Sequence, residues 1–306
     1  VYSSTKFLNS SPPNLDLEKL DLMMQNHQIS FSDLMNTIKK IKKTSVHIVG
    51  DTIVDTYTRT NFIGGQTKTP TFSVLYEKED SFVGGAAIVA LHMKAAGANV
   101  VFTTTISDDK KGKFVKNVLK KNRIKCNFFS EVGRPTTDKN SFISTTYRLL
   151  KVDTLSNAPI NEDTLSKILH KVKNEKTQVT VFSDFRHGIF NPSSIKKLIS
   201  AIPKKNFKAA DSQVASRWGN ITEFKNFDLL TPNEKEARFS LGDQDSTVSS
   251  LAGLILEKSR YKNLILKLGS RGVFCNGIRG KKMSPFAIGV FTDNVVDAVG
   301  SGDALL

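Results

Sequence analysis

Few cysteines, no long apolar run and no export signal mark this chain of 306 residues. Its two cysteines, Cys126 and Cys275, have no metal-ligand spacing, so we expect buried or incidental thiols of a reducing compartment. No stretch reaches about 18 consecutive apolar residues, so no transmembrane helix is expected. Residues 1–13 are polar and lack the charged-then-apolar order of a signal peptide. A cytoplasmic protein without a membrane partner is therefore expected.

Acidic side chains are in the minority, since 29 Asp and Glu stand against 44 Lys and Arg, giving a formal net charge of +15. Such a balance fits either nucleic-acid binding or attraction of phosphorylated small molecules. The lysines are scattered over many expected helices, however, and no basic stripe interleaved with aromatic residues appears. Solvated helix faces that attract small phosphorylated molecules are therefore favoured over a nucleic-acid partner.

The composition of the chain changes near residue 45. Residues 10–14 are linker-like, and Leu15 to Lys43 is expected to be helical with lysines at its end. We therefore assign residues 14–45 as linker and helix, and residues 46–306 as one large domain.

From Val46 onward, short apolar strands alternate with amphipathic helices. This alternation is typical of βαβ units and predicts an α/β fold with a doubly wound, mostly parallel sheet. Thr231-Pro232 is expected to cap a helix that starts at Asn233. Strands are expected at 46–51, 100–106, 179–184, 207–211, 227–230, 264–268 and 272–275, with helices at 86–96, 110–122, 161–174, 191–202 and 246–259.

Several polar residues lie at the carboxyl ends of these strands, where ligands bind in sheets of this kind. One such aspartate is usually a helix cap, but a whole series favours a binding site. The series consists of Asp51, Asp184, Asp211, Asn233 and Asp303.

A small second sheet is expected to stand off the main body. Thr56 to Thr60 and Thr71 to Tyr76 are β-prone segments around a Gly64-Gly65 turn, and Phe142 to Tyr147 alternates like a further strand. We expect these segments to form a lid that consists of residues 56–76 and 141–148.

The last stretch carries the strongest chemical signal. A short apolar strand runs into Asp297, and Gly300-Ser301-Gly302 then leads into a helix with Asp303 in its first turn. Glycines let backbone N–H groups converge on an anion, and a helix N-terminus adds positive charge there. A carboxylate beside such a site suggests a base that takes a proton from an attacking hydroxyl. An ordinary strand–turn–helix junction capped by Asp303 fits the motif equally well.

Asn233 and Glu236 are three residues apart at a helix start and share a face. Their oxygens could orient Mg²⁺ through its water ligands near a triphosphate. Taken alone, this spacing fits a helix-capping pattern better.

Together these motifs resemble the ribokinase-type (PfkB) carbohydrate kinases, and the resemblance spans Val46 to Leu306. The last motif matches the family signature Asp-Thr-x-Gly-Ala-Gly-Asp with valine and serine as variations. In order along the chain, the motifs are Gly50-Asp51, Gly84-Gly85-Ala86-Ala87, Asn233-x-x-Glu236, Leu268-Gly269-Ser270-Arg271-Gly272 and Asp297 to Asp303.

Within the family, the chain is most similar to the heptose 7-phosphate kinase part of bifunctional ADP-heptose synthases. The residues that carry this similarity are Gly50-Asp51-x-x-x-Asp55-x-Tyr57, Ser183 to Gly188 and Leu230 to Asn233. The resemblance implies ATP-dependent phosphorylation of D-glycero-D-manno-heptose 7-phosphate to the 1,7-bisphosphate, a step toward lipopolysaccharide precursors.

Both ends of the chain look cut. Val1 is not a start methionine, and Leu306 stops one turn into an apolar helix, so residues 1–306 alone are expected to be weakly active or inactive. Residues 1–13, and Ser3 to Lys6 in particular, resemble the tail of a cytidylyltransferase-like domain. This similarity implies a fused nucleotidyltransferase upstream of Val1, and lid-to-lid homodimers are common in the family.

The resemblance also implies a role for each matching residue. Asp303 is the base, and Gly300, Ser301 and Gly302 form the anion hole. Asn233 and Glu236 manage Mg²⁺ and phosphate, with Glu236 acting on the metal through water. The lid excludes water. Sugar contacts are expected from Asp51, Gly84, Gly85, Asp184 and Arg186, and nucleotide contacts from Lys267, Gly269 and Gly272.

Three departures from the family pattern leave the sugar open. Ile88 replaces the usual asparagine after Gly-Gly-Ala-Ala, and Arg186-His187 and Ser212-Gln213 differ from the commonest heptose-kinase sequence. Arg186 and His187 either contact a substrate phosphate or are a surface residue and a local turn contact. Another sugar or nucleoside kinase, or a non-catalytic binding module, therefore stays open.

Overall fold

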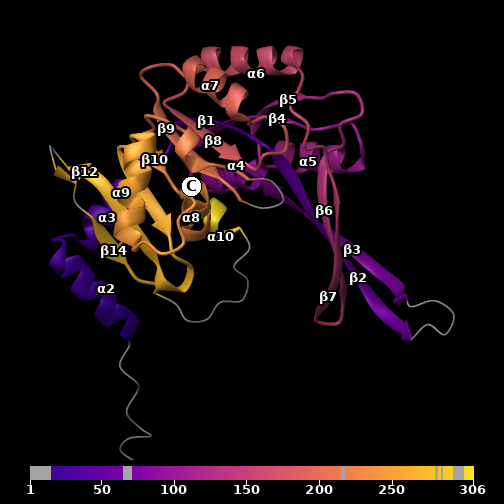
Figure 1. Ribbon diagram of the computed structural model, residues 1–306, viewed down its shortest axis with the longest axis horizontal. Helices are drawn as coiled ribbons and strands as arrows, with labels where there is room; N and C mark the ends of the chain where they lie inside the picture. Colours follow the sequence, from indigo (N-terminus) through magenta and orange to yellow (C-terminus); the bar gives the residue numbers. More distant parts are fainter. Residues whose placement is uncertain (1–14, 65–70, 215–217, 280–281, 284, 292–299) are drawn as a thin grey trace, which may run out of the picture.

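A large, mostly parallel β-sheet forms the body of the protein, and a four-stranded sheet projects from it (Figure 1). The computed structural model describes residues 15–64, 71–214, 218–279, 282–283, 285–291 and 300–306. The expectations for the tail at 1–13, for Gly65 and for Asp297 concern residues outside these ranges.

The large sheet has the order β13-β12-β11-β10-β9-β8-β1-β4-β5, and β14 pairs with β12. All strands from β5 across to β11 pair in parallel, while β12 is antiparallel to β11. This confirms the predicted doubly wound, mostly parallel α/β sheet. Its strands are β1 (Ser45–Gly50), β4 (Asn99–Thr105), β5 (Lys125–Phe129), β8 (Val179–Asp184), β9 (Phe207–Ser212), β10 (Leu229–Leu230), β11 (Asn263–Lys267), β12 (Val273–Arg279), β13 (Lys282–Met283) and β14 (Phe286–Ile288).

Helices cover both faces of this sheet, so each central strand is buried on both sides. Successive residues of β8 show this, because Val181 belongs to one apolar cluster and Phe182 to the other. The helices are α4 (Ala86–Ala95), α5 (Lys110–Lys121), α6 (Glu162–Asn174), α7 (Pro192–Ala201), α8 (Glu234–Leu241), α9 (Val248–Ser259) and α10 (Ser301–Leu305), with 3₁₀ turns η1 (Ile221–Glu223) and η2 (Gly269–Arg271).

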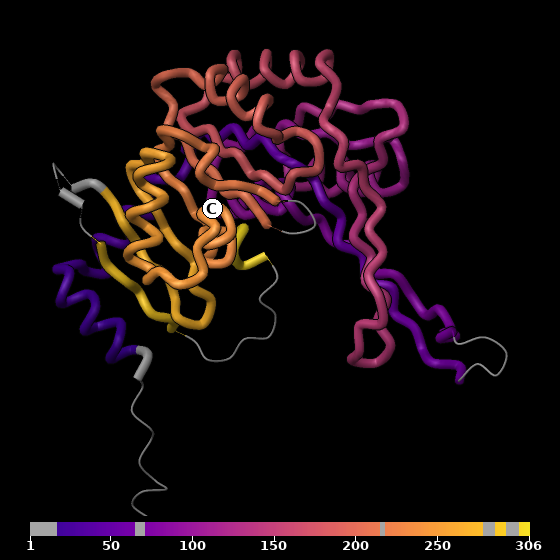
Figure 2. Tube along the Cα trace, in the orientation of Figure 1, coloured from indigo at the N-terminus to yellow at the C-terminus, as the bar shows by residue number. Residues whose placement is uncertain are grey.

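The projecting sheet, called the lid below, has the order β3-β2-β6-β7. Its strands are β2 (Thr52–Gly64), β3 (Ser73–Gly85), β6 (Thr137–Ser144) and β7 (Tyr147–Thr154). In Figure 2 it extends as an arm from the body. Because β2 follows β1 after the single residue Asp51, the lid is continuous with the centre of the main sheet.

Three local predictions were wrong. Leu15 to Lys43 is two helices, α2 (Leu15–Asn26) and α3 (Phe31–Ile41), because Ser30 and Asp33 form a capping box that begins a new helix. The predicted strand at Phe142 to Tyr147 contains the turn between β6 and β7. The cap of α8 is Asn233, not Thr231-Pro232.

Strands β5, β7, β13 and β14 were not predicted from the sequence.

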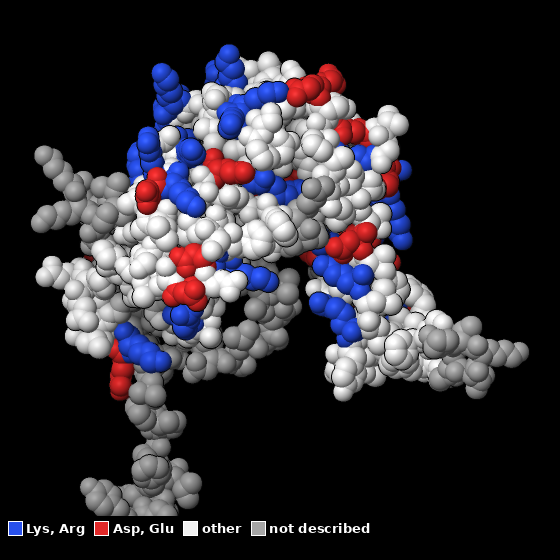
Figure 3. Space-filling model, viewed as in Figure 1, with Lys and Arg blue, Asp and Glu red and all other residues white. Residues whose placement is uncertain are grey.

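The Lys and Arg side chains on the face shown in Figure 3 are dispersed over the body and the lid. Within the described part of the chain, no helix is both long and apolar enough to cross a membrane.

Candidate active site

Two cavities meet at Asp303. The first, called the lid cavity, has a volume of about 650 Å³ and lies between the lid and the body, with Gly84, Gly85 and Ile88 in its wall. The second, called the hairpin cavity, has a volume of about 660 Å³ and is lined by residues of β12, the segment after β14 and Gly269. Both cavities include Gly300 and Asp303, so ligands in the two cavities would face each other across this carboxylate.

Gly300 makes the turn that places Asp303 there. Its φ of +80° lies in the left-handed region that favours glycine, and α10 begins at the next residue. The Ala304 N–H donates to the Gly300 carbonyl at 3.0 Å and closes the first helical turn. N–H groups in a first helical turn have no carbonyl partner within their own helix and bind anions readily.

The Asp303 carboxylate is suited to accept a proton. Its Oδ1 is buried and has no hydrogen-bond partner within the described ranges. Burial raises the pKa of Asp303 to about 7, the nearby Asp211 adds to this shift, and Lys267 opposes it. A carboxyl group with this pKa can exchange a proton near neutral pH.

Lys267 places a positive charge beside the same turn. Its Nζ pairs with Asp211 Oδ2 at 3.0 Å, and a Cβ added to Gly302 would lie 3.4 Å from this nitrogen. Burial lowers the pKa of Lys267, but the Asp211 and Glu236 carboxylates outweigh this effect and raise it above its ordinary value. Lys267 is therefore a permanent ammonium group at the junction of the two cavities.

Asn233 and Glu236 form the capping box of α8. Asn233 Oδ1 accepts from the Glu236 N–H at 2.8 Å, and Glu236 Oε2 accepts from the Asn233 N–H at 2.7 Å. Burial, followed by the Asp211 charge, raises the pKa of Glu236 to about 8. Among the residues described, no group of three His, Cys, Asp or Glu could hold a metal ion directly. The buried Asp211 Oδ1 has no hydrogen-bond partner among the described residues, and a carboxylate oxygen of this kind fits the water ligands of a hydrated cation.

Asp51 lies behind the lid cavity. It is buried, and its carboxylate accepts N–H bonds from Phe185, His187 and Ile189 at 3.1, 3.2 and 3.3 Å. These bonds hold the loop after β8. The expected direct contact between Asp51 and a sugar is therefore not what the geometry provides.

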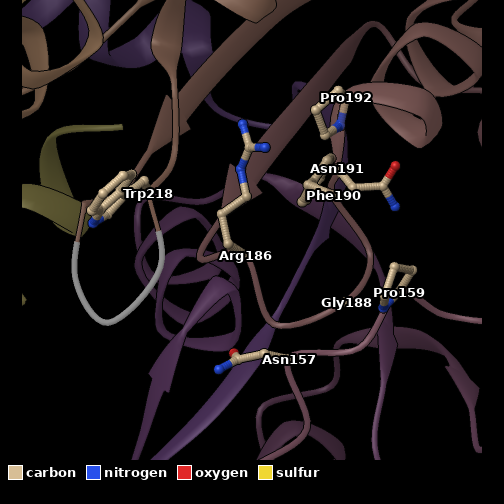
Figure 4. A pocket seen from close by; sticks show the side chains of 8 residues that line it. All are labelled: Asn157, Pro159, Arg186, Gly188, Phe190, Asn191, Pro192 and Trp218. Atoms are coloured by element: carbon tan, nitrogen blue, oxygen red, sulfur yellow. The ribbon is translucent and has the colours of Figure 1, made fainter. Parts of the chain in front are cut away.

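Asp184 and Arg186 line neither of the two cavities that meet at Asp303. Asp184 Oδ2 accepts from Arg186 Nε at 2.8 Å, and Arg186 also pairs with Glu223. Arg186 is therefore buried between two carboxylates, which rules out the alternative of a surface residue, and its expected contact with the substrate stays a prediction. Its side chain lines a separate cavity of about 360 Å³, where Figure 4 shows it between Trp218 on one side and Asn191 and Pro192 on the other.

Asp55 takes the place in the lid cavity that was expected for Asp51. It lies on β2, where Ile53, Asp55, Tyr57 and Arg59 alternate and all line the cavity. A Cβ added to Gly84 would lie 2.2 Å from Asp55 Oδ2, so the glycine leaves room for the carboxylate. The sequence motif Gly50-Asp51-x-x-x-Asp55 contained Asp55, but only the strand alternation reveals its position.

Cationic side chains of the lid were missed as well. Lys139 on β6 and Lys151 on β7 line the lid cavity together with Arg59. No local motif surrounds either lysine, so the strand pairing that brings them together was the only available signal.

An α/β sheet with a strand lid, and with two cavities that meet at one carboxylate, is the arrangement expected of a kinase that acts on small molecules. The family model described as pfkB family carbohydrate kinase matches residues 43–306, and the chain belongs to this family. It is therefore a phosphotransferase with an alcohol group as acceptor. This confirms the predicted family and enzyme class.

Curated proteins similar to this chain include two bifunctional proteins named HldE. The bifunctional protein HldE of Campylobacter jejuni strain RM1221 is 28% identical over 277 residues, which cover 87% of this chain and 55% of the relative. The bifunctional protein HldE of Aliarcobacter butzleri is 26% identical over 76% of this chain and 49% of its own length. The chain thus spans about half the length of these relatives.

Solved structures with the same fold include two sugar kinases. Arabidopsis thaliana ribokinase complexed with ribose and ATP aligns with a TM-score of 0.65 at 18% identity, covering 86% of this chain and 83% of that chain. Escherichia coli phosphofructokinase-2 in complex with fructose-6-phosphate aligns with a TM-score of 0.66 at 17% identity, covering 86% and 84%. These alignments confirm the predicted ribokinase-like fold.

Proposed function

We propose that this carbohydrate kinase transfers the γ-phosphate of ATP to the anomeric hydroxyl of D-glycero-D-manno-heptose 7-phosphate, giving the 1,7-bisphosphate. The observation that carries the proposal is the buried Asp303 Oδ1, without a hydrogen-bond partner in the described structure, at the point where the two cavities meet. The similarity to HldE supports the choice of a heptose phosphate.

ATP occupies the hairpin cavity and the sugar occupies the lid cavity. The sugar hydroxyl attacks the γ-phosphorus, the bond from this phosphorus to the β–γ bridging oxygen breaks, and the hydroxyl proton passes to Asp303. ADP leaves with the electron pair of the broken bond. Gly300, Ser301, Gly302 and Lys267 stabilise the negative charge on the transferring phosphoryl group.

Mg²⁺ is expected with ATP, and it supplies charge neutralisation between the phosphates. Glu236, with Asn233 orienting its carboxylate, would hold the ion through water. Gly269 and Gly272 border the nucleotide. Glu236 ionises more readily beside a cation, which offsets the raised pKa of this carboxyl group in the ligand-free protein.

Asp55 binds hydroxyls of the sugar next to Gly84 and Gly85, and Asp51 supports this wall by holding the loop after β8. Lid closure over the sugar excludes water from the reaction. Ile88 adds an apolar surface where a sugar contact was expected. This surface favours a second candidate function, the phosphorylation of a different sugar phosphate at the same site.

The test is ADP release from Mg-ATP with a panel of sugars, with D-glycero-D-manno-heptose 7-phosphate first. Release that depends on this sugar supports the proposal. Release only with another sugar would keep the kinase and discard the heptose. A ligand bound without turnover across the panel would favour a non-catalytic binding module.

Two features of the larger assembly belong to this proposal. Because the chain spans about half of its HldE relatives, we propose a fused nucleotidyltransferase domain as its partner. We also propose a homodimer through the lid, since the lid exposes apolar side chains. These are Phe62, Ile63, Phe72, Leu75, Tyr76, Tyr147, Leu150 and Val152.

A further inference from the structure

An aromatic residue of the lid cavity belongs to neither apolar cluster of the body. Phe185 follows β8 directly and lines the lid cavity together with Gly300 and Asp303. It is partly buried, yet it is a member of neither of the two apolar clusters that the described residues form. A phenyl ring that packs in neither core has apolar surface that a ligand can cover.

The alternation of β8 places Phe185 on the face of the sheet that α4 covers. Val181 packs in the cluster that contains Ala86 of α4, and Phe185 lies four residues further along the same strand direction. Ile88 of α4 lines the lid cavity as well and, like Phe185, is partly buried and outside both clusters of the described structure. Two apolar side chains from different elements thus contribute surface to one cavity.

Buried carboxylates hold the backbone around Phe185. The Phe185 N–H donates to Asp51 Oδ2 at 3.1 Å, and the Arg186 N–H donates to Asp184 Oδ1 at 2.9 Å. Arg186 has a φ of +58°, in the left-handed region that few residues other than glycine, asparagine and aspartate adopt. Its guanidinium pairs with Asp184 at 2.8 Å and with Glu223, so two ion pairs stabilise this conformation. The direction of the Phe185 ring therefore depends on Arg186.

Polar groups of the same cavity flank this apolar surface. Asp55 on β2 and Asp303 on α10 both line it, and each carboxylate can accept hydrogen bonds from hydroxyl groups. A sugar ring has an apolar C–H face and hydroxyls along its edge. Such a ring can lie on Phe185 and Ile88 while its hydroxyls reach the two carboxylates, an arrangement typical of small-molecule sites with apolar walls and few polar groups.

We propose that Phe185 and Ile88 form an apolar platform for the C–H face of the acceptor sugar ring, and that Arg186 is a positioning residue that holds Phe185 in place. This inference rests on the proposed kinase function and adds specificity-determining residues to it. The apolar face of the sugar then contributes to its affinity together with the hydroxyls.

The test measures kcat, KM for the sugar and KM for ATP. Phe185→Ala should raise KM for the sugar roughly 10- to 100-fold, the range expected when one phenyl ring loses its apolar contact, and leave KM for ATP within a few-fold. Phe185→Tyr keeps the ring and should stay within a few-fold of the wild type on both. The control is Phe207→Ala, which removes a ring that is 42% exposed at the start of β9 and lines neither cavity at Asp303. An unchanged sugar KM in Phe185→Ala would overturn the platform.

Arg186→Asn tests the positioning role, because asparagine adopts the left-handed conformation but makes neither ion pair. Alone it should raise KM for the sugar. Added to Phe185→Ala it should raise this KM no further, since the ring through which it acts is gone. The same fold-increase in both backgrounds would overturn the positioning role. Thermal melting verifies folding, and Glu223→Gln, which removes only one ion pair, replaces Arg186→Asn in this comparison if that variant does not fold.

A fluorescence measurement separates failure of the platform from failure of the kinase proposal. Trp218 is the single tryptophan of the chain, so Phe185→Trp combined with Trp218→Phe places one indole at the lid cavity. A sugar that binds against this indole should change its emission, even if no sugar of the panel is turned over. Such a change without turnover would keep the platform and contradict the proposed kinase function. Emission that stays the same with every sugar would contradict the platform, whatever the activity.

Discussion

At the scale of single residues, the proposed chemistry depends on three coupled side chains. Asp303 faces both cavities, Lys267 lies beside its turn, and Asp211 holds Lys267 at 3.0 Å. Asp211 raises the pKa of Asp303 and Lys267 lowers it. The charge of each neighbour therefore sets the pH range in which Asp303 can act as a base.

We predict that kcat/KM for the sugar falls as the pH drops below about 7, because Asp303 must be ionised to accept the proton. Lys267→Met removes a cation that favours the ionised form, so the acid limb of the pH profile should move to higher pH. Asp211→Asn removes a like charge, so the limb should move to lower pH. Full pH–rate profiles measure these shifts. If the acid limb of both variants lies at the same pH as in the wild type, the electrostatic coupling of Asp303 to Lys267 and Asp211 is contradicted.

Gly84 offers a second prediction. In Gly84→Ala the new Cβ would meet Asp55 Oδ2, so the carboxylate must move. A displacement of this size should cost on the order of 10²-fold in kcat/KM for the sugar. Gly253→Ala in α9 is the matched control, because its Cβ would meet no atom within 4 Å. Steady-state kinetics of the two variants test this prediction, and equal activity of the two would contradict a role for Asp55 in sugar binding.

The sequence predicted some site residues and not others for a physical reason. Asp303 and its glycines are consecutive in the sequence, so a local motif was enough to predict them. Asp51 was assigned to the sugar because a sequence cannot show that three backbone N–H groups of the loop after β8 already bind its carboxylate. Lys139 and Lys151 become neighbours only through strand pairing.

At the scale of elements, α5 supports the base of the lid through Lys111. Its Nζ donates to Thr56 at 2.8 Å, to Glu79 at 2.8 Å and to Ser81 at 3.0 Å. The first two strands of the lid are thereby tied to a helix of the body. The bond from Lys111 is also the main reason that the pKa of Glu79 lies below its usual value.

We predict that Lys111→Met destabilises the protein by about 1–3 kcal/mol, because it leaves partly buried acceptors of the lid without their donor. Because a looser lid binds the sugar less well, KM for the sugar should also rise. Lys113→Met, at an exposed position of the same helix, should change neither quantity. Urea unfolding and steady-state kinetics provide the measurements, and a Lys111 variant as stable as the control would refute the tie.

Elements with local signals were the predictable ones. α6 and α7 begin where Asn161 and Asn191 cap them, as the sequence predicts. The break between α2 and α3 was missed because the Ser30 capping box lies inside an otherwise helical pattern. β5 and β7 were missed because their sequences are mixed and their pairing partners are distant along the chain.

At the scale of the whole molecule, the fold could be predicted because alternating strands and helices permit few arrangements. The assembly of the chains could not be predicted, since it depends on which side chains are exposed on the folded surface. The exposed apolar side chains of the lid carry the proposed dimer, and they belong to strands that the sequence placed only in part.

We predict that Leu75→Asp on the lid weakens the dimer by placing a charge in an apolar interface. Leu22→Asp on α2 is the control, because both leucines are 59% exposed. Light scattering at equal concentrations should give a dimer for the wild type and Leu22→Asp, and a larger monomer fraction for Leu75→Asp. A monomeric wild type, or a Leu75 variant that dimerises as well as the control, would rule out the lid as the interface.

The most direct test of the central claim compares ADP release by the wild type and by Asp303→Asn, with Mg-ATP and D-glycero-D-manno-heptose 7-phosphate. Asparagine keeps the shape of the side chain but cannot accept the proton. We predict release that depends on the sugar and falls by at least about 10²-fold in the variant. Activity of the variant within a few-fold of the wild type would contradict the role of Asp303 and the mechanism built on it.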